Sequence, residues 1–189
     1  MKKSLTLIIL LACIAMSIFA QQPKHELRAT WLATVDNIDW PRTKISNDAT
    51  REQQKKELTD ILDKMVTGNM HACFMQVRSL CDAMYQSSYE PWSKSLTGTR
   101  GKNPGYDPLQ FAIEEAHKRG LELHIWVNPF RVTTSGTLDS SDKLHQQAGD
   151  WIIKYNNGSF KGQIIDPGFP EARAYVIKVL MEIVNNYDV

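Results

Sequence analysis

Apolar residues recur along the chain with two alternating periods, one typical of strands and one typical of helices. The stretch from Leu27 to Val35 is rich in β-favouring residues and ends in a polar cluster with Pro41, which predicts a first strand. Thr50 forms a capping-box pattern with Gln53, and apolar residues then fall at helical spacing until Gly68: Leu58, Ile61, Leu62 and Met65. The pattern predicts a helix that begins at Thr50.

The same order of elements follows again. Ala72 to Val77 predicts a second strand, and a long irregular stretch leads from it to Tyr106. Asp107 is an N-cap with Pro108 at the first helical position, and Gly120 supplies a stop. The apolar stripe of this predicted helix is Leu109, Ala112, Ile113 and Ala116.

A third strand is predicted from Leu121 to Asn128. Its alternation separates an apolar face from a more polar one, with Leu121, Leu123, Ile125 and Val127 on the first and Glu122, His124, Trp126 and Asn128 on the second.

A long excursion follows Pro129. It contains a predicted hairpin, Trp151–Tyr155 and Phe160–Ile165, around Asn156-Asn157-Gly158, which we expect outside the main sheet. Pro170 and Glu171 then open a helix, and a fourth strand would start at Tyr187. The predicted buried side of this helix is Val176, Leu180, Ile183 and Val184.

Repeated strand, helix, strand order predicts an α/β fold with parallel strands and crossover helices. Every long segment follows a strand, whereas the turns after helices are short; the long segments are 36–47, 79–106 and 129–169. This asymmetry is typical of a (β/α)8 TIM barrel, of which the chain would supply about three βα units and the start of strand four. A doubly wound sheet is the alternative, but its dinucleotide form needs a glycine-rich loop, and 36–48 has no glycine.

The first 20 residues have the pattern of a secretory signal. Lys2 and Lys3 precede an apolar run from Leu5 to Ala20, shorter than a membrane-spanning helix, and we expect cleavage after Ala20. Lipid attachment at Cys13 is a less favoured alternative, because the residues after it stay apolar. The sequence thus predicts an exported domain, 21–189, in the periplasm, on the outer surface or outside the cell.

Charge and cysteine content exclude several classes of function. The formal net charge is +1 without a Lys/Arg cluster, which argues against nucleic acid as a partner, and no transmembrane segment is expected after signal cleavage. Cys73 and Cys81 form either one disulfide or two free thiols. No His or Cys spacing matches a metal motif, so we expect neither metal nor cofactor.

The segments after the predicted strands carry aromatic, carboxylate, amide and guanidinium side chains. This mixture suits a sugar site, because pyranose faces are apolar while their hydroxyls need donors and acceptors. The candidate substrate-binding residues are Asp36, Asp39, Trp40, Arg78, Asp82, Trp92, Asn128, Arg131 and Asp166, with Tyr85 beside them.

Each candidate also has a structural interpretation. Trp40 and Trp92 would anchor long loops, Arg78 would pair with Asp82, and Asp166 would cap the helix at Pro170.

Several ordered motifs resemble the glycosyl hydrolase-like 10 family of bacterial envelope proteins. They are the stretches 28–41, 76–78 with 82–83 and 91–93, 96–98, 105–109, 126–131, 166–168 and 187–189. The resemblance implies a (β/α)8 barrel related to glycosidases and hydrolysis of glycan chains, either peptidoglycan or another polysaccharide. Ser79-Leu80-Cys81 departs from the small Pro- and Gly-containing turn usual in the family, which bears on the placement of Asp82.

The family continues past Tyr187-Asp188-Val189 into an acidic strand end. Glycoside hydrolysis normally needs two carboxyls, about 5–5.5 Å apart for retention or roughly 6.5–9.5 Å for inversion. The resemblance therefore implies catalytic carboxylates beyond Val189, with Asp82 and Asp166 as the weaker candidates within the chain. We expect the N-terminal part of an exported glycoside hydrolase, inactive by itself; the alternative is a non-catalytic glycan-binding envelope protein.

Overall fold

The computed structural model describes residues 26–158 and 161–189. The predicted signal at 1–20, the lipid-attachment alternative at Cys13 and residue Phe160 of the predicted hairpin lie outside the described residues. Within the described part, no helix is long and apolar enough to cross a membrane.

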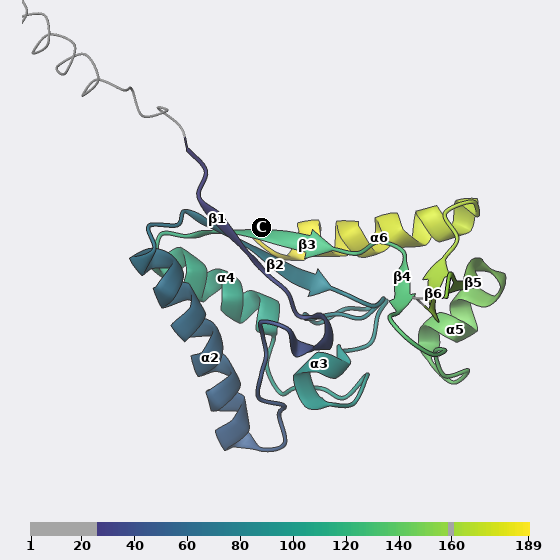
Figure 1. Cartoon of the computed structure of the whole chain (residues 1–189), viewed down its shortest axis with the longest axis horizontal. Coiled ribbons are helices and arrows are strands. Elements are labelled where there is room, and N and C mark those ends of the chain that lie inside the picture. The colour runs from purple at the N-terminus through teal and green to yellow at the C-terminus, as the bar shows by residue number, and fades with distance from the viewer. Residues whose placement is uncertain (1–25, 159–160) are drawn as a thin grey trace, which may run out of the picture.

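Three parallel strands form the main sheet. They are paired in the order β1-β2-β3, with Ala29 opposite Ala72 and Ala72 opposite Glu122: β1 (Ala29–Leu32), β2 (Ala72–Arg78) and β3 (Glu122–Val127). Two crossover helices, α2 (Asp48–Thr67) and α4 (Pro108–Lys118), connect them, as the alternation of periods predicts. The fold is mixed α/β, and the three strand ends point toward the same edge (Figure 1).

A second, antiparallel sheet lies beyond that edge (Figure 1). Its strand order is β4-β6-β5: β4 (Arg131–Thr133), β5 (Ile152–Asn156) and β6 (Lys161–Ile165). The pairing of β5 with β6 confirms the predicted hairpin and its separation from the main sheet. Short elements fill the connections, and a long helix ends the chain: η1 (Val35–Asn37), α3 (Lys94–Thr97), α5 (Lys143–Ala148), η2 (Gly149–Trp151) and α6 (Pro170–Asn186).

The two crossover helices begin at side-chain caps. The Asp107 carboxylate accepts a hydrogen bond from the Gln110 backbone N–H at 3.0 Å, which confirms the predicted start of α4. The predicted start of α2 was wrong. Asn47 is the cap, its side-chain oxygen accepting from the Thr50 N–H at 2.9 Å while the Thr50 hydroxyl accepts from the Asn47 N–H. The capping box therefore uses Thr50 as its third helical residue, and α2 begins nearly one turn earlier.

One face of the main sheet packs against the crossover helices. Leu58 and Leu62 of α2 and Leu109 of α4 are fully buried with Met75 and Val77 of β2, as their helical and strand spacings predict. Strand β1 is shorter than predicted, since Leu27 is largely exposed and Val35 belongs to η1.

The buried side of α6 differs by one position from the prediction. Val176 and Ile183 are buried, but Val184 is 59% exposed and Val179 is buried in its place. At about 100° per residue, 176, 179 and 183 share one side of a helix and 184 lies outside it. Cys73 and Cys81 are both buried and free, so the disulfide alternative does not hold.

The opposite face of the main sheet carries a row of rings. Trp31 stacks on Phe74 with ring centroids 5.1 Å apart, Phe74 stacks on His124 at 4.8 Å, and Trp126 meets Trp31 edge-on. Trp31 is 60% exposed. Among the described residues, no helix covers this row as α2 and α4 cover the other face.

A buried ion pair joins the end of β2 to the loop behind it. Arg78 donates from Nε and Nη2 to the two carboxylate oxygens of Glu90, at 2.8 and 2.5 Å, and both side chains are almost fully buried. Its Nη1 donates to the backbone oxygens of Asn128 and Pro129 after β3, and the Tyr175 hydroxyl of α6 donates to Glu90. Burial lowers the pKa of Arg78, but Cys81 and Glu90 beside it raise it overall. One ion pair thus connects β2, two loops and α6.

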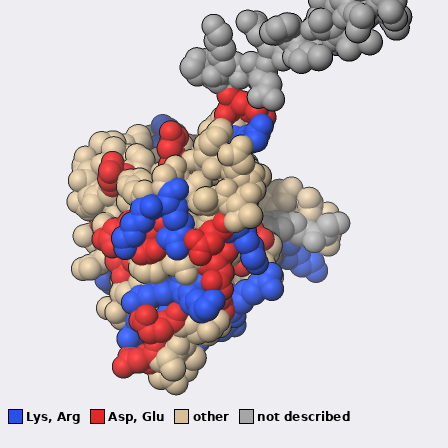
Figure 2. Space-filling view, turned by 90° about the vertical axis from the view of Figure 1, so that its left-hand side faces the viewer, with Lys and Arg blue, Asp and Glu red and all other residues tan. Residues whose placement is uncertain are grey.

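On the face shown in Figure 2, basic and acidic side chains lie next to one another. Exposed carboxylates of α2 form such ion pairs, Asp60 with Lys56 and Asp63 with Arg119. Exposed pairs of this kind contribute little stability each, because water and salt screen them.

We expect Asn47→Ala to lower the free energy of unfolding by about 1 kcal/mol, because the Thr50 N–H loses its acceptor. Thermal unfolding followed by circular dichroism measures the change. Asn47→Ser, which keeps an oxygen at the cap, should unfold close to the unsubstituted chain; equal losses in both variants would contradict the assigned cap.

We expect Glu90→Gln to lower the free energy of unfolding by about 3 kcal/mol or more, since it leaves the buried Arg78 charge without its counter-ion. The matched control is Glu52→Gln, which removes an exposed ion pair with Lys55 and should cost less than about 1 kcal/mol. Urea unfolding of both variants makes the comparison, and a similar small loss in each would refute the role given to Glu90.

Candidate functional site

A cleft of about 780 Å³ opens at the carboxyl ends of the three parallel strands. Each strand contributes to it through the segment that follows: Asp36 after β1, residues 80–101 after β2 and residues 132–143 after β3. In (β/α) barrels and open α/β sheets alike, binding sites form at this end of the strands, because the loops there converge.

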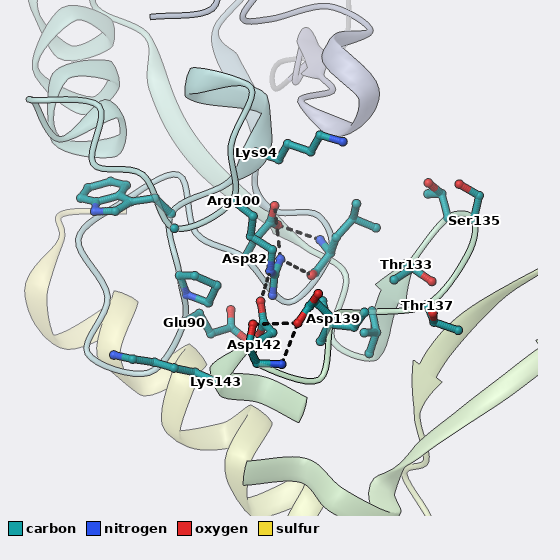
Figure 3. A pocket seen from close by; sticks show the side chains of 18 of the residues that line it. Asp82, Glu90, Lys94, Arg100, Thr133, Ser135, Thr137, Asp139, Asp142 and Lys143 are labelled. Carbon is teal, nitrogen blue, oxygen red and sulfur yellow. Dashed lines mark hydrogen bonds and ion pairs between the residues drawn. The ribbon is translucent and has the colours of Figure 1, made fainter. Parts of the chain in front are cut away.

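Arg100 lies in the middle of the cleft, between Asp82 and Asp142 (Figure 3). Its Nε donates to an Asp142 carboxylate oxygen at 2.6 Å, and its Nη1 and Nη2 donate to the backbone oxygens of Leu80 and Cys81 at 3.1 and 2.7 Å. Burial opposes the charge of Arg100, but the hydrogen bond to Asp142 and the charge of Asp82 raise its pKa overall. The guanidinium stays charged and joins two loops.

Asp82 forms part of the floor of the cleft and is almost fully buried. Its Oδ1 accepts hydrogen bonds from the Leu80 N–H at 2.8 Å and the Ser79 hydroxyl at 3.1 Å, and its Oδ2 lies 3.9 Å from Arg100. The proposed pairing of Arg78 with Asp82 was wrong, since Arg78 pairs with Glu90 and Asp82 faces Arg100.

Asp36 reaches the cleft from a strained turn. Its φ of 51° and that of Asn37, 56°, are both left-handed, a conformation uncommon outside glycine but tolerated by Asp and Asn. Asp39 closes this turn by accepting from the Ala33 N–H at 2.8 Å. Asp36 is exposed at the cleft. Burial lowers the pKa of Arg131, and the negative charges of Asp36 and Asp82 oppose that effect.

Three of the predicted substrate-binding residues line the cleft: Asp36, Asp82 and Trp92. Trp40 is fully buried, and its indole N–H donates to the Gln54 backbone oxygen, so it anchors its loop. Arg78 is buried behind the cleft, where its guanidinium is used by Glu90.

The remaining candidates lie beside the cleft. Asn128 accepts a hydrogen bond from the Trp126 indole at 3.0 Å, and Arg131 donates from Nε to the Ser79 backbone oxygen. Asp166 accepts from the Gly168 N–H in its own turn; the expectation that it caps α6 was wrong, because Phe169 is the cap residue and makes no side-chain cap bond.

The sequence interpretation missed several residues of the cleft. Hydroxyl side chains follow β4 along one wall, and charged groups come from long irregular segments; these residues are Glu90, Lys94, Arg100, Thr133, Ser135, Thr137, Asp139, Asp142 and Lys143. Thr133, Lys94 and Lys143 stand at the ends of short elements and the others lie in irregular segments, so no hydrophobic pattern indicates where these side chains point. The one available signal was that these polar residues occur in the long segments that follow strands.

The side chains of the cleft are of the kinds that can bind a polyol. Carboxylates, hydroxyls and lysines face a space that also contacts the half-buried Trp92, and this combination can bind hydroxyls while packing against the apolar face of a sugar ring. In residues 26–158 and 161–189, no three His, Cys, Asp or Glu side chains are placed to hold a metal ion.

The sequence of the chain is similar to that of known glycosyl hydrolases. The chain is 44% identical over 171 residues to glycosyl hydrolase YngK of Bacillus subtilis, covering 89% of this chain and 32% of that protein. It is 38% identical over 180 residues to glycosyl hydrolase DigH of Escherichia coli, covering 89% and 41%. The chain therefore spans about a third of the first of these relatives and about two fifths of the second.

Among solved structures, a maltogenic α-amylase of Thermotoga neapolitana aligns with a TM-score of 0.49 and 10% identity, covering 86% of this chain and 37% of that chain. An α-L-fucosynthase of Thermotoga maritima aligns at 0.42 and 13%, covering 69% and 25%. The sequence model of the glycosyl hydrolase-like 10 family matches residues 26–189. The resemblance inferred from the sequence motifs is thereby confirmed, and the chain belongs to the glycosyl hydrolase-like 10 family.

Proposed function

We propose that the chain forms the glycan-binding face of an exported glycoside hydrolase that acts on peptidoglycan or another polysaccharide. The observation that carries the proposal is the cleft at the strand ends, where Asp36, Asp82 and Trp92 meet a wall of hydroxyls. Membership of a glycosyl hydrolase-like family supports the same reaction class.

The proposal includes a (β/α)8 barrel for the whole protein. The row of rings Trp31, Phe74, His124 and Trp126 supports it, because an apolar sheet face is stable only when another layer covers it. In a closed barrel this face is the interior and the helices lie outside, which agrees with α2 and α4 packing on the other face.

Non-catalytic glycan binding is the second candidate. It is favoured by the use of the cleft carboxylates within the described residues: Glu90 pairs with Arg78, and Asp142 and Asp82 face Arg100. Carboxylates committed to arginines hold loops in place, whereas glycoside hydrolysis needs one carboxyl to donate a proton. Release of reducing ends from a bound glycan separates the two candidates.

We expect Asp36→Asn to weaken the binding of an N-acetylglucosamine tetramer about tenfold, because a sugar hydroxyl loses a charged acceptor worth about 1.5 kcal/mol. Asn tolerates the left-handed backbone at this position, so folding should be unchanged. Isothermal titration gives the Kd, with co-sedimentation on peptidoglycan sacculi as the second probe.

The matched control is Asp48→Asn, at an exposed carboxylate in the first turn of α2, which should bind as the unsubstituted chain does. Equal affinity of all three proteins would remove Asp36 from the site.

Export is tested by expressing the full chain in a Gram-negative host. We expect the periplasmic or extracellular product to start at Gln21, because cleavage follows Ala20. Intact-mass measurement identifies the new terminus. A product that retains residues 1–20, or one that starts at Cys13 with added lipid mass, would contradict the proposed processing.

A further inference from the structure

One wall of the cleft belongs to the insertion after β3. Residues 133–141, here called the hydroxyl wall, place Thr133, Ser135 and Thr137 along one side of the space, while Lys94 stands across from them (Figure 3). The Thr133 hydroxyl accepts from the Gln163 N–H, and the Gln163 side chain accepts from the Leu138 N–H. These bonds hold the wall to β6, which is part of the same insertion.

A single ion pair joins this insertion to the loop after β2 across the cleft. Arg100 donates from Nε to Asp142 Oδ2 at 2.6 Å, and Asp142 Oδ1 accepts from the Leu144 N–H at the start of α5. Arg100 also holds the backbone oxygens of Leu80 and Cys81. Among the described residues, no other hydrogen bond or ion pair links 133–148 with 79–101.

The surroundings of the pair make it stronger than an exposed ion pair. The side chains of Arg100 and Asp142 are only 19% and 10% exposed, so water screens their attraction less than at the surface. The guanidinium is also oriented by two backbone acceptors, which lowers the entropy lost in forming the pair. Val132 and Leu144 also share a buried apolar cluster with Cys81, which helps to hold the insertion to the loop after β2.

We propose that Arg100 is a positioning residue for glycan recognition. Through Asp142 it holds the hydroxyl wall in place across the cleft from Lys94. This inference rests on the proposed function and specifies its substrate side: a ring rich in hydroxyls, bound between the wall and the loop after β2.

The test compares Asp142→Asn with the full unsubstituted chain. The matched control is Asp63→Asn, which removes an ion pair of the same length, 2.6 Å, with Arg119 on the helical side of the sheet. Asp142→Glu keeps the carboxylate and serves as the rescue variant. All are measured at a temperature at which circular dichroism shows them folded, by hydrogen exchange with mass spectrometry and by titration with the N-acetylglucosamine tetramer.

We expect Asp142→Asn to speed amide exchange in residues 133–143 and to raise the Kd about tenfold, with Asp142→Glu close to the unsubstituted chain and Asp63→Asn unchanged. Faster exchange with an unchanged Kd would overturn the positioning role, since the pair would then only stabilise the loop. Unchanged amide exchange in residues 133–143 would contradict the claim that the ion pair holds the hydroxyl wall in place. If the unsubstituted chain binds neither tetramer nor sacculi, the proposed function fails, and faster exchange would still support the hold on the wall.

Discussion

The buried ion pair between Arg78 and Glu90 is the interaction on which the structure at the carboxyl ends of the parallel strands depends. Four of the five guanidinium N–H groups are used, two by Glu90 and two by backbone oxygens after β3. The Tyr175 hydroxyl brings α6 to the same carboxylate. Removing two charges from water is unfavourable unless every partner is in place, so this cluster requires the loops to adopt one arrangement.

The cleft follows from that arrangement. Once Arg78 holds the loop after β2 and the chain after β3 together, Asp82 and Arg100 face the same space as Asp142 from the insertion. The two arginines therefore have different roles: Arg78 orders the interior behind the cleft, and Arg100 connects the two walls of the cleft. Side chains left to contact a ligand include the exposed Asp36, Lys94, Ser135 and Thr137, and the half-buried Trp92.

The two faces of the main sheet have different physical requirements. Leu, Met and Val side chains pack against α2 and α4, whereas Trp31 and its neighbouring rings present an apolar surface that the described helices leave open. Such a surface lowers the free energy when another apolar layer covers it, which is the condition a barrel interior meets. The proposed barrel would supply that layer, whereas the described helices stabilise only the other face.

Local pattern determined much of the architecture. Helical and strand periods located β2, β3, α2 and α4, and the Asn-Asn-Gly turn at 156–158 located the β5–β6 hairpin. Asp107-Pro108 defined the start of α4. These signals arise from neighbours in sequence. The order of strands and long loops indicated which end of the sheet carries the cleft, and motif resemblance identified the family.

Tertiary structure decided what each polar side chain does. Arg78 stands at a strand end, where a rim position was expected, yet Glu90, twelve residues away, draws its guanidinium inward. Trp40 points into the interior because Gln54 of α2 offers an acceptor there. Arg100 and Asp142 are 42 residues apart, and only the folded loops bring them to 2.6 Å. Hydrophobic periodicity shows which side of one helix or strand is buried, so the sequence was enough to locate the helices and strands. The partner of a charged side chain comes from a segment distant in sequence, so only the tertiary structure showed which side chains face the cleft.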